Sequence, residues 1–262
     1  MKNKKLFLFD IDGTLAIGDT LYKGSRDLLS YIEEINGKAY FITNNSTKSG
    51  QDYVEKFKSC FSLSTKSEDF VTSGLITLLF LKEHFKNKKI YVLGTSSFIS
   101  ELRKNGLKIT EEADEDIECI VVAYDNELTY EKLTIASKLL ETTDVPYYAT
   151  NPDLRCPIDF GFVPDCGSIC NMLQSTTDRS PIYLGKPNKE VVEYCLRQSG
   201  FSKEETVVIG DRLYTDIACG INACVDTALV LTGEASSTDL YDTQFPPTFT
   251  YETIYDLFLS IK

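Results

Sequence analysis

The sequence has one histidine, His84, among its 262 residues. His84 falls in an expected helix, so we expect it to have a structural role. A Ser-His-Asp triad, or a metal site built from several histidines, needs imidazoles at the centre of the chemistry. The scarcity of histidine therefore nearly excludes both mechanisms.

Long hydrophobic runs and excess positive charge are also missing. The apolar run Leu6–Phe9 ends at Asp10 and is too short for a signal peptide. Leu75–Leu81 is the most apolar later segment, and it is too short to span a bilayer. The net charge is −12 and the pI about 4.7, so a polyanion such as nucleic acid would be repelled over most of the surface. A small phosphorylated ligand then requires a local positive site.

The eight cysteines follow no zinc-binding pattern. Cys156, Cys166 and Cys170 fall close together, but no histidine lies near them and their spacing fits no zinc motif. A large, acidic chain with scattered cysteines is typical of a reduced compartment. We therefore expect free thiols and a cytoplasmic protein with no membrane and no nucleic-acid partner.

Short apolar runs alternate with helical patterns along the chain. The runs are continuous, as expected for strands that are covered on both faces. The alternation predicts an α/β fold with a parallel sheet, in which ligands bind beyond the carboxyl ends of the strands. The expected strands are Leu6–Phe9, Ala39–Ile42, Ile90–Leu93, Cys119–Ala123, Tyr147–Ala149, Ile182–Leu184, Val207–Ile209 and Ala228–Leu231. The expected helices are Ser25–Glu34, Gly50–Lys58, Glu68–Phe85, Ser97–Lys104, Tyr130–Leu140, Ser168–Gln174, Lys189–Ser199 and Thr215–Ala218.

Two aspartates, Asp10 and Asp12, directly follow the first expected strand in the segment Asp-Ile-Asp-Gly-Thr. Gly13 allows the backbone to turn sharply, so that both carboxylates can point into one pocket. One carboxylate can then attack phosphorus while the other exchanges a proton with the leaving oxygen. A capped turn without chemistry is the structural alternative, since Asp and Gly favour turns.

Further polar residues follow later strands. Thr43 supplies a hydroxyl, and Lys186 supplies a point charge for a phosphoryl oxygen. Asp211 and Asp216 follow the strand Val207–Ile209 and offer the oxygen ligands that Mg²⁺ prefers. Each residue alone is equally compatible with a structural role, but their joint occurrence after separate buried strands indicates one active site.

This set resembles the four motifs of the haloacid dehalogenase (HAD) superfamily of phosphatases. The flanking residues are similar to those of its NagD and p-nitrophenyl-phosphatase branch, and the similarity covers nearly the whole chain. The segments that carry it are 41–46 (FITNNS), 149–153 (ATNPD), 184–187 (LGKP), 210–217 (GDRLYTDI) and 229–233 (LVLTG).

The resemblance implies a Rossmann-like core domain formed by residues 1–80 and 181–262. A smaller α/β cap domain, residues 81–180, would be inserted between the Thr43 and Lys186 motifs. Dimerisation through the cap is common in this branch, so a homodimer is a further expectation. The sequence departs from the family at Cys224, where relatives usually carry glycine; a positive φ there would bring local strain.

The resemblance also implies a role for each motif residue. Asp10 would be the nucleophile that becomes aspartyl phosphate, and Asp12 the general acid and base. Mg²⁺ would be held by Asp10, the Asp12 carbonyl and Asp211, with Asp216 in a supporting position. Phosphoryl oxygens would be bound by Thr43, the Asn44 amide and Lys186.

The function expected from these residues is Mg²⁺-dependent hydrolysis of small phosphomonoesters, such as p-nitrophenyl phosphate or sugar, nucleotide, phosphoglycolate or pyridoxal phosphates. Arg155 lies on an expected loop and is a candidate for binding a substrate carboxylate or second phosphate. Two alternatives remain: a phosphotransferase or phosphomutase on the same core, and a non-catalytic protein that binds a phosphorylated ligand.

Overall fold

The structure is a computed structural model that describes residues 1–158 and 160–262. The chain divides into two compact units. Unit 1 comprises residues 1–43, 50–71 and 186–262, and unit 2 comprises residues 44–49 and 72–185. The divisions expected from the sequence, at 80/81 and 180/181, differ from these because helix α3 (Ser73–His84) and strand β12 (Ile182–Tyr183) both belong to unit 2.

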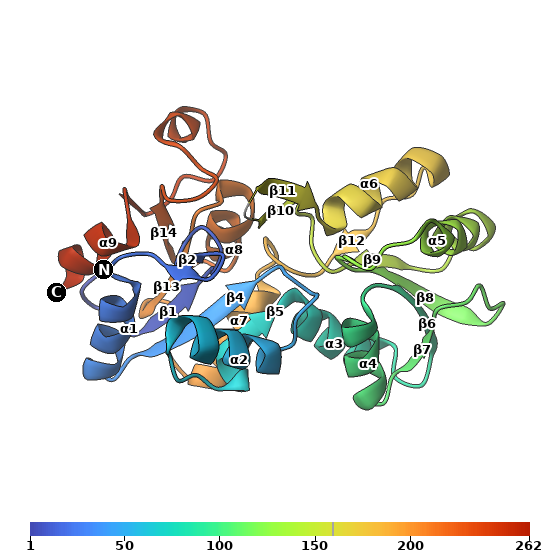
Figure 1. Ribbon diagram of the computed structural model, residues 1–262, viewed down its shortest axis with the longest axis horizontal. Helices are drawn as coiled ribbons and strands as arrows, with labels where there is room; N and C mark the ends of the chain where they lie inside the picture. The colour runs from blue at the N-terminus through green and yellow to red at the C-terminus, as the bar shows by residue number, and fades with distance from the viewer. Residues whose placement is uncertain (159) are drawn as a thin grey trace. The chain divides into compact units, whose positions relative to one another are not determined.

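Unit 1 is built on a six-stranded sheet (Figure 1). β1 occupies a central position and pairs in parallel with β13 and β4, while β13 pairs with β14 and β14 with β15, also in parallel. In order across the sheet the strands are β15 (Phe249–Tyr251), β14 (Asp226–Val230), β13 (Thr206–Gly210), β1 (Leu6–Phe9), β4 (Lys38–Thr43) and β5 (Phe70–Thr72). A short antiparallel hairpin, β2 (Ala16–Ile17) and β3 (Thr20–Leu21), follows β1.

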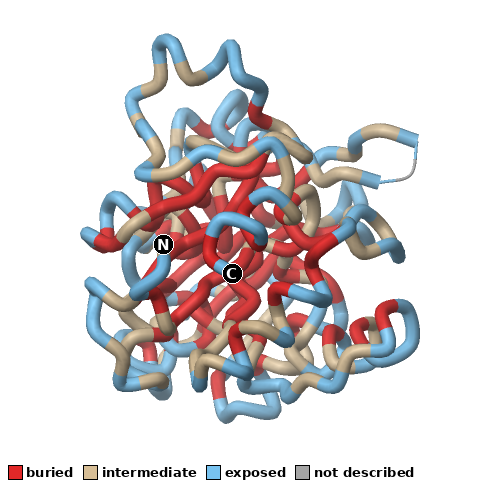
Figure 2. Tube along the Cα trace, turned by 90° about the vertical axis from the view of Figure 1, so that its left-hand side faces the viewer, coloured by how far each residue is buried: buried red, intermediate tan, exposed pale blue. Residues whose placement is uncertain are grey.

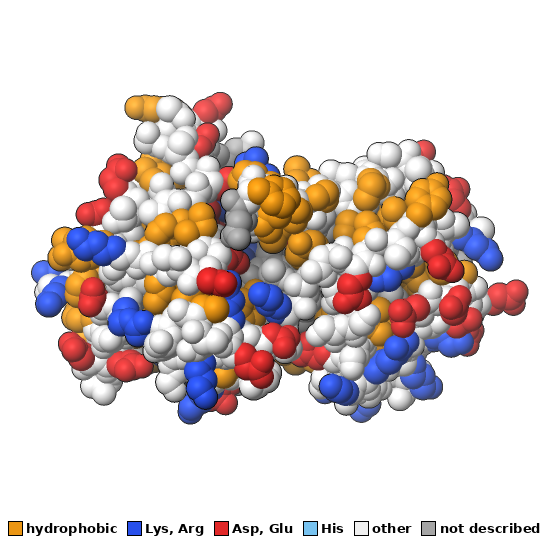
Figure 3. All heavy atoms as spheres, viewed as in Figure 1, with side chains coloured by type: hydrophobic (Ala, Val, Ile, Leu, Met, Phe, Trp, Pro, Cys, Tyr) orange, Lys and Arg blue, Asp and Glu red, His pale blue; other side chains and the backbone are white. Residues whose placement is uncertain are grey.

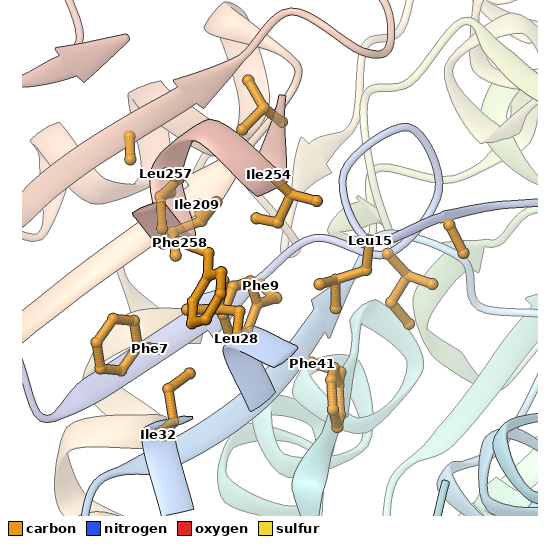
Figure 4. Packing of buried hydrophobic residues seen from close by; sticks show 14 of the residues in the cluster. Phe7, Phe9, Leu15, Leu28, Ile32, Phe41, Ile209, Ile254, Leu257 and Phe258 are labelled. Carbon is orange, nitrogen blue, oxygen red and sulfur yellow. The ribbon is translucent and has the colours of Figure 1, made fainter. Parts of the chain in front are cut away.

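Helices cover both faces of this sheet. α1 (Ser25–Glu34), α2 (Gly50–Phe61) and α9 (Ile254–Ile261) share one apolar core with alternate strand residues such as Phe7 and Phe9 (Figure 4). α7 (Glu190–Ser199) contacts β1 and β4, and α8 (Ala218–Asn222) contacts β13 and β14. Because side chains alternate along a strand, Val208, which lies against Gly220 of α8, points away from the face of Val207.

Unit 2 has its own five-stranded sheet, in which neighbouring strands pair in parallel. α3 and α4 (Ser96–Lys104) pack on Ile90 and Val92, whereas α5 (Tyr130–Thr142) and α6 (Cys166–Thr177) pack on Tyr91 and Leu93. The strand order is β12, β9 (Tyr147–Ala149), β8 (Ile117–Val122), β6 (Lys89–Leu93) and β7 (Lys108–Thr110). β10 (Arg155–Ile158) and β11 (Gly161–Pro164) form a separate antiparallel hairpin.

The expected α/β fold with a parallel sheet is confirmed. Figure 2 shows the strands as buried runs, with exposed positions on the loops and on the outer sides of helices. All four residues of β1 and all five residues of β13 are buried. A continuous apolar run is what a strand covered on both faces requires, and this explains why the sequence pattern located these strands well.

The prediction of a helix at Glu68–Phe85 was wrong for its first residues. Residues 68–85 were predicted to be helical throughout, but β5 occupies Phe70–Thr72 and α3 begins only at Ser73. The Thr72 side chain accepts a hydrogen bond from the Leu75 amide, so Thr72 caps the helix that follows it. The buried Phe70 and Val71 favour the extended conformation that precedes the cap.

Helix α3 contains the apolar segment Leu75–Leu81. Leu78 and Leu81 are buried in the core of unit 2, which accounts for the hydrophobicity of this stretch. Within residues 1–158 and 160–262, the structure contains no helix with the length and hydrophobicity needed to cross a bilayer.

Cys224 has φ = 57°, the left-handed conformation that glycine adopts most easily. We expect Cys224→Gly to raise the free energy of unfolding by about 1 kcal/mol, because the Cβ no longer opposes this conformation. Urea unfolding measures the change. Cys224→Ala is the matched control, since it removes the thiol but keeps the Cβ; an equal gain in both variants would rule out backbone strain as the cause.

Candidate active site

Asp10 lies directly beyond the buried strand β1, at the carboxyl edge of the unit 1 sheet. Its amide continues the ladder by donating to the Ile209 carbonyl at 2.8 Å. The Asp10 side chain is 13% exposed, and that of Asp12 is 31% exposed with Lys56 Nζ 3.9 Å from its Oδ1. The strand thus holds the nucleophile candidate in a mostly buried position, while Asp12 has more access to solvent.

The turn after Asp10 depends on glycine. Gly13 has φ = 98°, and its amide donates to the Ala16 carbonyl at 2.8 Å. A Cβ built on Gly13 would lie only 2.7 Å from Asp211 Oδ2. Both the backbone conformation and the close approach of Asp211 therefore require glycine at this position.

Lys186 is the cation of the site, and it is only 2% exposed. Its Nζ donates to Asp10 Oδ1 at 2.7 Å, to Asp216 Oδ1 at 2.6 Å and to the Ile42 carbonyl at 3.0 Å. Burial alone would lower the pKa of Lys186, but the charges of Asp10 and Asp216 outweigh burial and raise it above its ordinary value. Lys186 is therefore a fixed positive charge beside Asp10.

Asp211 and Asp216 follow β13, and a π-helical turn, Leu213–Ile217, places the second near the first. Asp211 Oδ2 accepts from the Glu234 amide at 2.7 Å, and its Oδ1 accepts from Thr14 Oγ1 at 3.3 Å. Asp216 Oδ2 accepts from the Arg212 amide at 3.0 Å. Both carboxylates are buried, and both are oriented by backbone N–H groups.

Asp10, Asp211 and Asp216 together have the donor set of a hard divalent cation. One carboxylate oxygen from each lies within 4.8 Å of the others, and no other such group of three His, Cys, Asp or Glu occurs among residues 1–158 and 160–262. Burial, followed by the charge of Asp216, raises the pKa of Asp211 to about 7. Burial, together with Asp216 and Asp211, also raises the pKa of Asp10 in spite of Lys186. One lysine does not balance three carboxylates, and a divalent cation bound by their oxygens would.

Thr43 joins this group through the sheet. It is the last residue of β4, whose Phe41 is the register partner of Phe9 in β1, and it is buried. Because Lys186 binds the carbonyl of Ile42, the preceding residue, the end of β4 lies beside the lysine. Five of the predicted site residues (Asp10, Thr43, Lys186, Asp211 and Asp216), together with Asp12, thus fall at one edge of one sheet.

Asn44 and Arg155 belong to unit 2, and their roles at the site stay predictions. The Asn44 carbonyl accepts hydrogen bonds from Ser73 Oγ at 2.6 Å and from Asn151 Nδ2 at 2.7 Å. Arg155 is the first residue of β10, so the expectation of a loop was wrong there. Its guanidinium lies 4.5 Å from the centroid of the Phe162 ring, and Figure 3 shows hydrophobic side chains gathered over β10 and β11.

Several residues that shape the site could not be recognised from sequence patterns. Glu234 binds the Asp211 carboxylate through its backbone N–H, a group that every residue except proline has. Lys56 lies in the middle of α2, where its side chain looks like any helix lysine. Thr232 Oγ1 donates to the Gly13 carbonyl at 2.6 Å and so joins two loops that are distant in sequence.

Comparison with known proteins agrees with this geometry. Residues 7–108 match the family described as haloacid dehalogenase-like hydrolase, and residues 183–257 match the HAD-hydrolase-like family. An acid sugar phosphatase of Staphylococcus aureus is 32% identical over 262 residues, which is 100% of each chain. The structure of 4-nitrophenylphosphatase from Thermotoga maritima is 36% identical, with a TM-score of 0.92 over 100% of this chain and 98% of that one. NagD from E. coli is 30% identical, with a TM-score of 0.85 over 97% and 98%. The chain therefore belongs to the haloacid dehalogenase-like hydrolases, in the branch of NagD and the p-nitrophenyl phosphatases, and it is an enzyme of the phosphoric monoester hydrolase class.

Proposed function

We propose that the chain hydrolyses small-molecule phosphomonoesters through an aspartyl-phosphate on Asp10, with Mg²⁺ as cofactor. The observation that carries this proposal is the arrangement of Lys186, Asp211 and Asp216 around Asp10, with a 2.7 Å bond from Lys186 Nζ to Asp10 Oδ1. Phosphoryl transfer depends mainly on positioning and charge neutralisation, and this arrangement offers both.

In the first half of the reaction, a carboxylate oxygen of Asp10 forms a bond to phosphorus while the bond to the ester oxygen breaks. Asp12 gives a proton to the departing oxygen, so the alcohol leaves neutral. In the second half Asp12 takes a proton from water, whose oxygen bonds to phosphorus as the Asp10–phosphorus bond breaks. Free phosphate leaves, and both aspartates return to their starting states.

The chain's remaining residues bind and balance charge. Thr43, the Asn44 amide and Lys186 would bind the phosphoryl oxygens, and Lys186 would offset the charge that builds up on them. Asp10, the Asp12 carbonyl and Asp211 would hold Mg²⁺, with Asp216 in support. Bound Mg²⁺ would supply the positive charge that allows a carboxylate and a phosphate dianion to approach each other.

Sugar phosphates and p-nitrophenyl phosphate are the substrates we propose first, since the relatives are named for such activities. A panel of phosphorylated sugars, nucleotides, phosphoglycolate and pyridoxal phosphate, assayed with and without Mg²⁺, tests the proposal. Release of free phosphate is expected only with Mg²⁺. Transfer of phosphate to an excess of acceptor alcohol, in place of release, would instead identify a phosphotransferase.

The raised carboxyl pKa values predict a pH-dependent effect of Mg²⁺ on stability. Burial raises the pKa of Asp211 to about 7 in the folded state, above the ordinary aspartate value of about 3.9. Between these values the folded state binds the extra proton, so the free energy of unfolding of the metal-free protein falls as pH rises from about 4 to about 7. Asp10 contributes in the same direction.

Mg²⁺ binds only the ionised carboxylates. It therefore stabilises the folded state most at pH values at which these carboxyl groups have already lost their protons. We expect a larger rise in Tm on addition of Mg²⁺ at pH 8 than at pH 5, measured by differential scanning calorimetry. Asp211→Asn is expected to lose most of the rise at pH 8. An equal rise at both pH values, or an undiminished rise in Asp211→Asn, would speak against a metal site at these residues.

A further inference from the structure

Asp211 and its neighbour Arg212 both hold Glu234, from two sides. The Asp211 carboxylate accepts the Glu234 amide at 2.7 Å, while the Glu234 carboxylate lies against Arg212, with Nε and Oε2 3.1 Å apart. Tyr214 OH donates to the other carboxylate oxygen of Glu234 at 3.2 Å. The Arg212 and Glu234 side chains are 12% and 18% exposed, so water weakens their attraction less than it does for a surface pair.

This contact fixes the backbone that lies against Asp211. The Ala235 amide donates to the Asp211 carbonyl at 3.1 Å, and a Cβ on Gly233 would overlap the Asp211 carboxylate. At the other end of the same segment, the Thr232 hydroxyl donates to the Gly13 carbonyl. The Thr232 carbonyl accepts a hydrogen bond from Tyr22 OH at 3.1 Å. Without the Arg212 contact, the Glu234 end of this segment would lose a side-chain anchor.

Arg212 also touches the second acidic residue. Its backbone amide donates to Asp216 Oδ2 at 3.0 Å, independently of its side chain. The backbone of Arg212 therefore contacts Asp216, whereas its side chain contacts Glu234, whose amide binds Asp211. Replacing only the side chain separates these two effects.

We propose that Arg212 and Glu234 act as a positioning pair, which holds the Glu234 amide on Asp211 Oδ2 and so sets the affinity of the site for Mg²⁺. The inference rests on the proposed function, because it takes Asp211 as a Mg²⁺ ligand. Partners that orient a metal-binding side chain commonly change metal affinity by about 10- to 100-fold when removed.

The sign of one effect distinguishes positioning from simple charge. Arg212→Met removes a positive charge close to the site. The loss of Coulomb repulsion alone would make Mg²⁺ bind more tightly. If the side chain instead positions Glu234 and Asp211, the same change weakens binding. Glu234→Gln weakens Mg²⁺ binding under either explanation. Only Arg212→Met therefore distinguishes the two explanations.

Isothermal titration calorimetry with MgCl₂ on the full chain tests the proposal, using wild type, Arg212→Met, Glu234→Gln and the double variant. We expect about a 10-fold higher Kd for Mg²⁺ in each single variant. The Kd of the double variant should be no higher than the higher of the two single-variant Kd values, because both changes break the same contact. Glu193→Gln, which breaks the Lys189 pair at 3.0 Å elsewhere in unit 1, controls for the change in charge and should leave the Kd unchanged.

A second measurement separates positioning from general damage. At saturating Mg²⁺ the KM for p-nitrophenyl phosphate should be unchanged in Arg212→Met, while the Mg²⁺ concentration for half-maximal activity rises. Tighter or unchanged Mg²⁺ binding in Arg212→Met would overturn the inference and leave the proposed function intact. If the wild type itself bound no Mg²⁺, the metal part of the proposed function would fail first, and the inference with it.

Discussion

Asp10→Asn should abolish turnover, with kcat for p-nitrophenyl phosphate lowered by roughly 10⁴-fold or more, as expected when a nucleophile is removed. The amide oxygen can still accept the bond from Lys186, but it is too weak a nucleophile to form the phosphorus bond. Burial and the neighbouring aspartates oppose the ionised form of Asp10, so the metal-free variant should be at least as stable as wild type. Steady-state kinetics and urea unfolding in chelator measure the two effects.

Asp19→Asn is the matched control, because Asp19 is exposed in the nearby β2–β3 turn. It should keep wild-type kcat. Mass spectrometry of acid-quenched wild type under turnover should find a phosphoryl group on the peptide that contains Asp10. Turnover by Asp10→Asn at near wild-type rate, or a phosphoryl group on another residue, would refute the proposed nucleophile.

Lys186→Met should have the second largest effect, on stability as well as on activity. Its Nζ separates Asp10 from Asp216 in a buried position, and breaking a buried charge pair commonly costs about 3–5 kcal/mol. We expect a loss of that size in the free energy of unfolding in chelator at pH 8. Loss of a charge that stabilises the transition state should also lower kcat by about 10²- to 10³-fold.

The stability loss in Lys186→Met should shrink at pH 5, since protonation of the raised-pKa carboxyls removes repulsion that the lysine had offset. Urea unfolding at the two pH values measures this recovery. Lys189→Met removes an exposed lysine three positions away and should change little. If Lys186→Met were as stable as Lys189→Met at pH 8, Lys186 would not offset the charges of the buried carboxylates.

The sequence predicted best those elements whose pattern has a single physical cause. β1 and β9 fall at the predicted residues, because a short continuous apolar run suits a strand covered on both faces. α1 also falls at the predicted bounds, since Leu28 and Ile32 lie one turn apart on the buried face. The parallel sheet then predicts that Asp10, Thr43 and Asp211 meet at one edge.

Elements that depend on distant partners could not be read in this way. β5 was taken as part of α3 because its three residues carry no pattern of their own, and only pairing with β4 makes them a strand. β10 was taken as a loop, yet it pairs with β11 in spite of its proline. Short strands of this kind are defined by their neighbours, which sequence patterns do not show.

At the site, residues that act through their side chains could be predicted from the sequence, but contacts made by the backbone could not. Asp10, Lys186 and Asp211 could be predicted because their chemistry lies in the side chain. The Glu234 amide could not, since a backbone N–H is present at nearly every position and only the fold selects one. The acidic composition called for a local cation, but the three bonds of Lys186 depend on the fold.

The assignment of residues 44–49 to unit 2 has a consequence for exchanging domains between relatives. Asn44 is held there by Ser73 and Asn151, and Ser46 Oγ receives the Tyr124 amide at 3.2 Å. A transplant of residues 72–185 alone would therefore leave these buried donors facing a foreign segment. A chimera that carries residues 44–49 along with the insert keeps the bonds and should fold, whereas its shorter counterpart should express poorly.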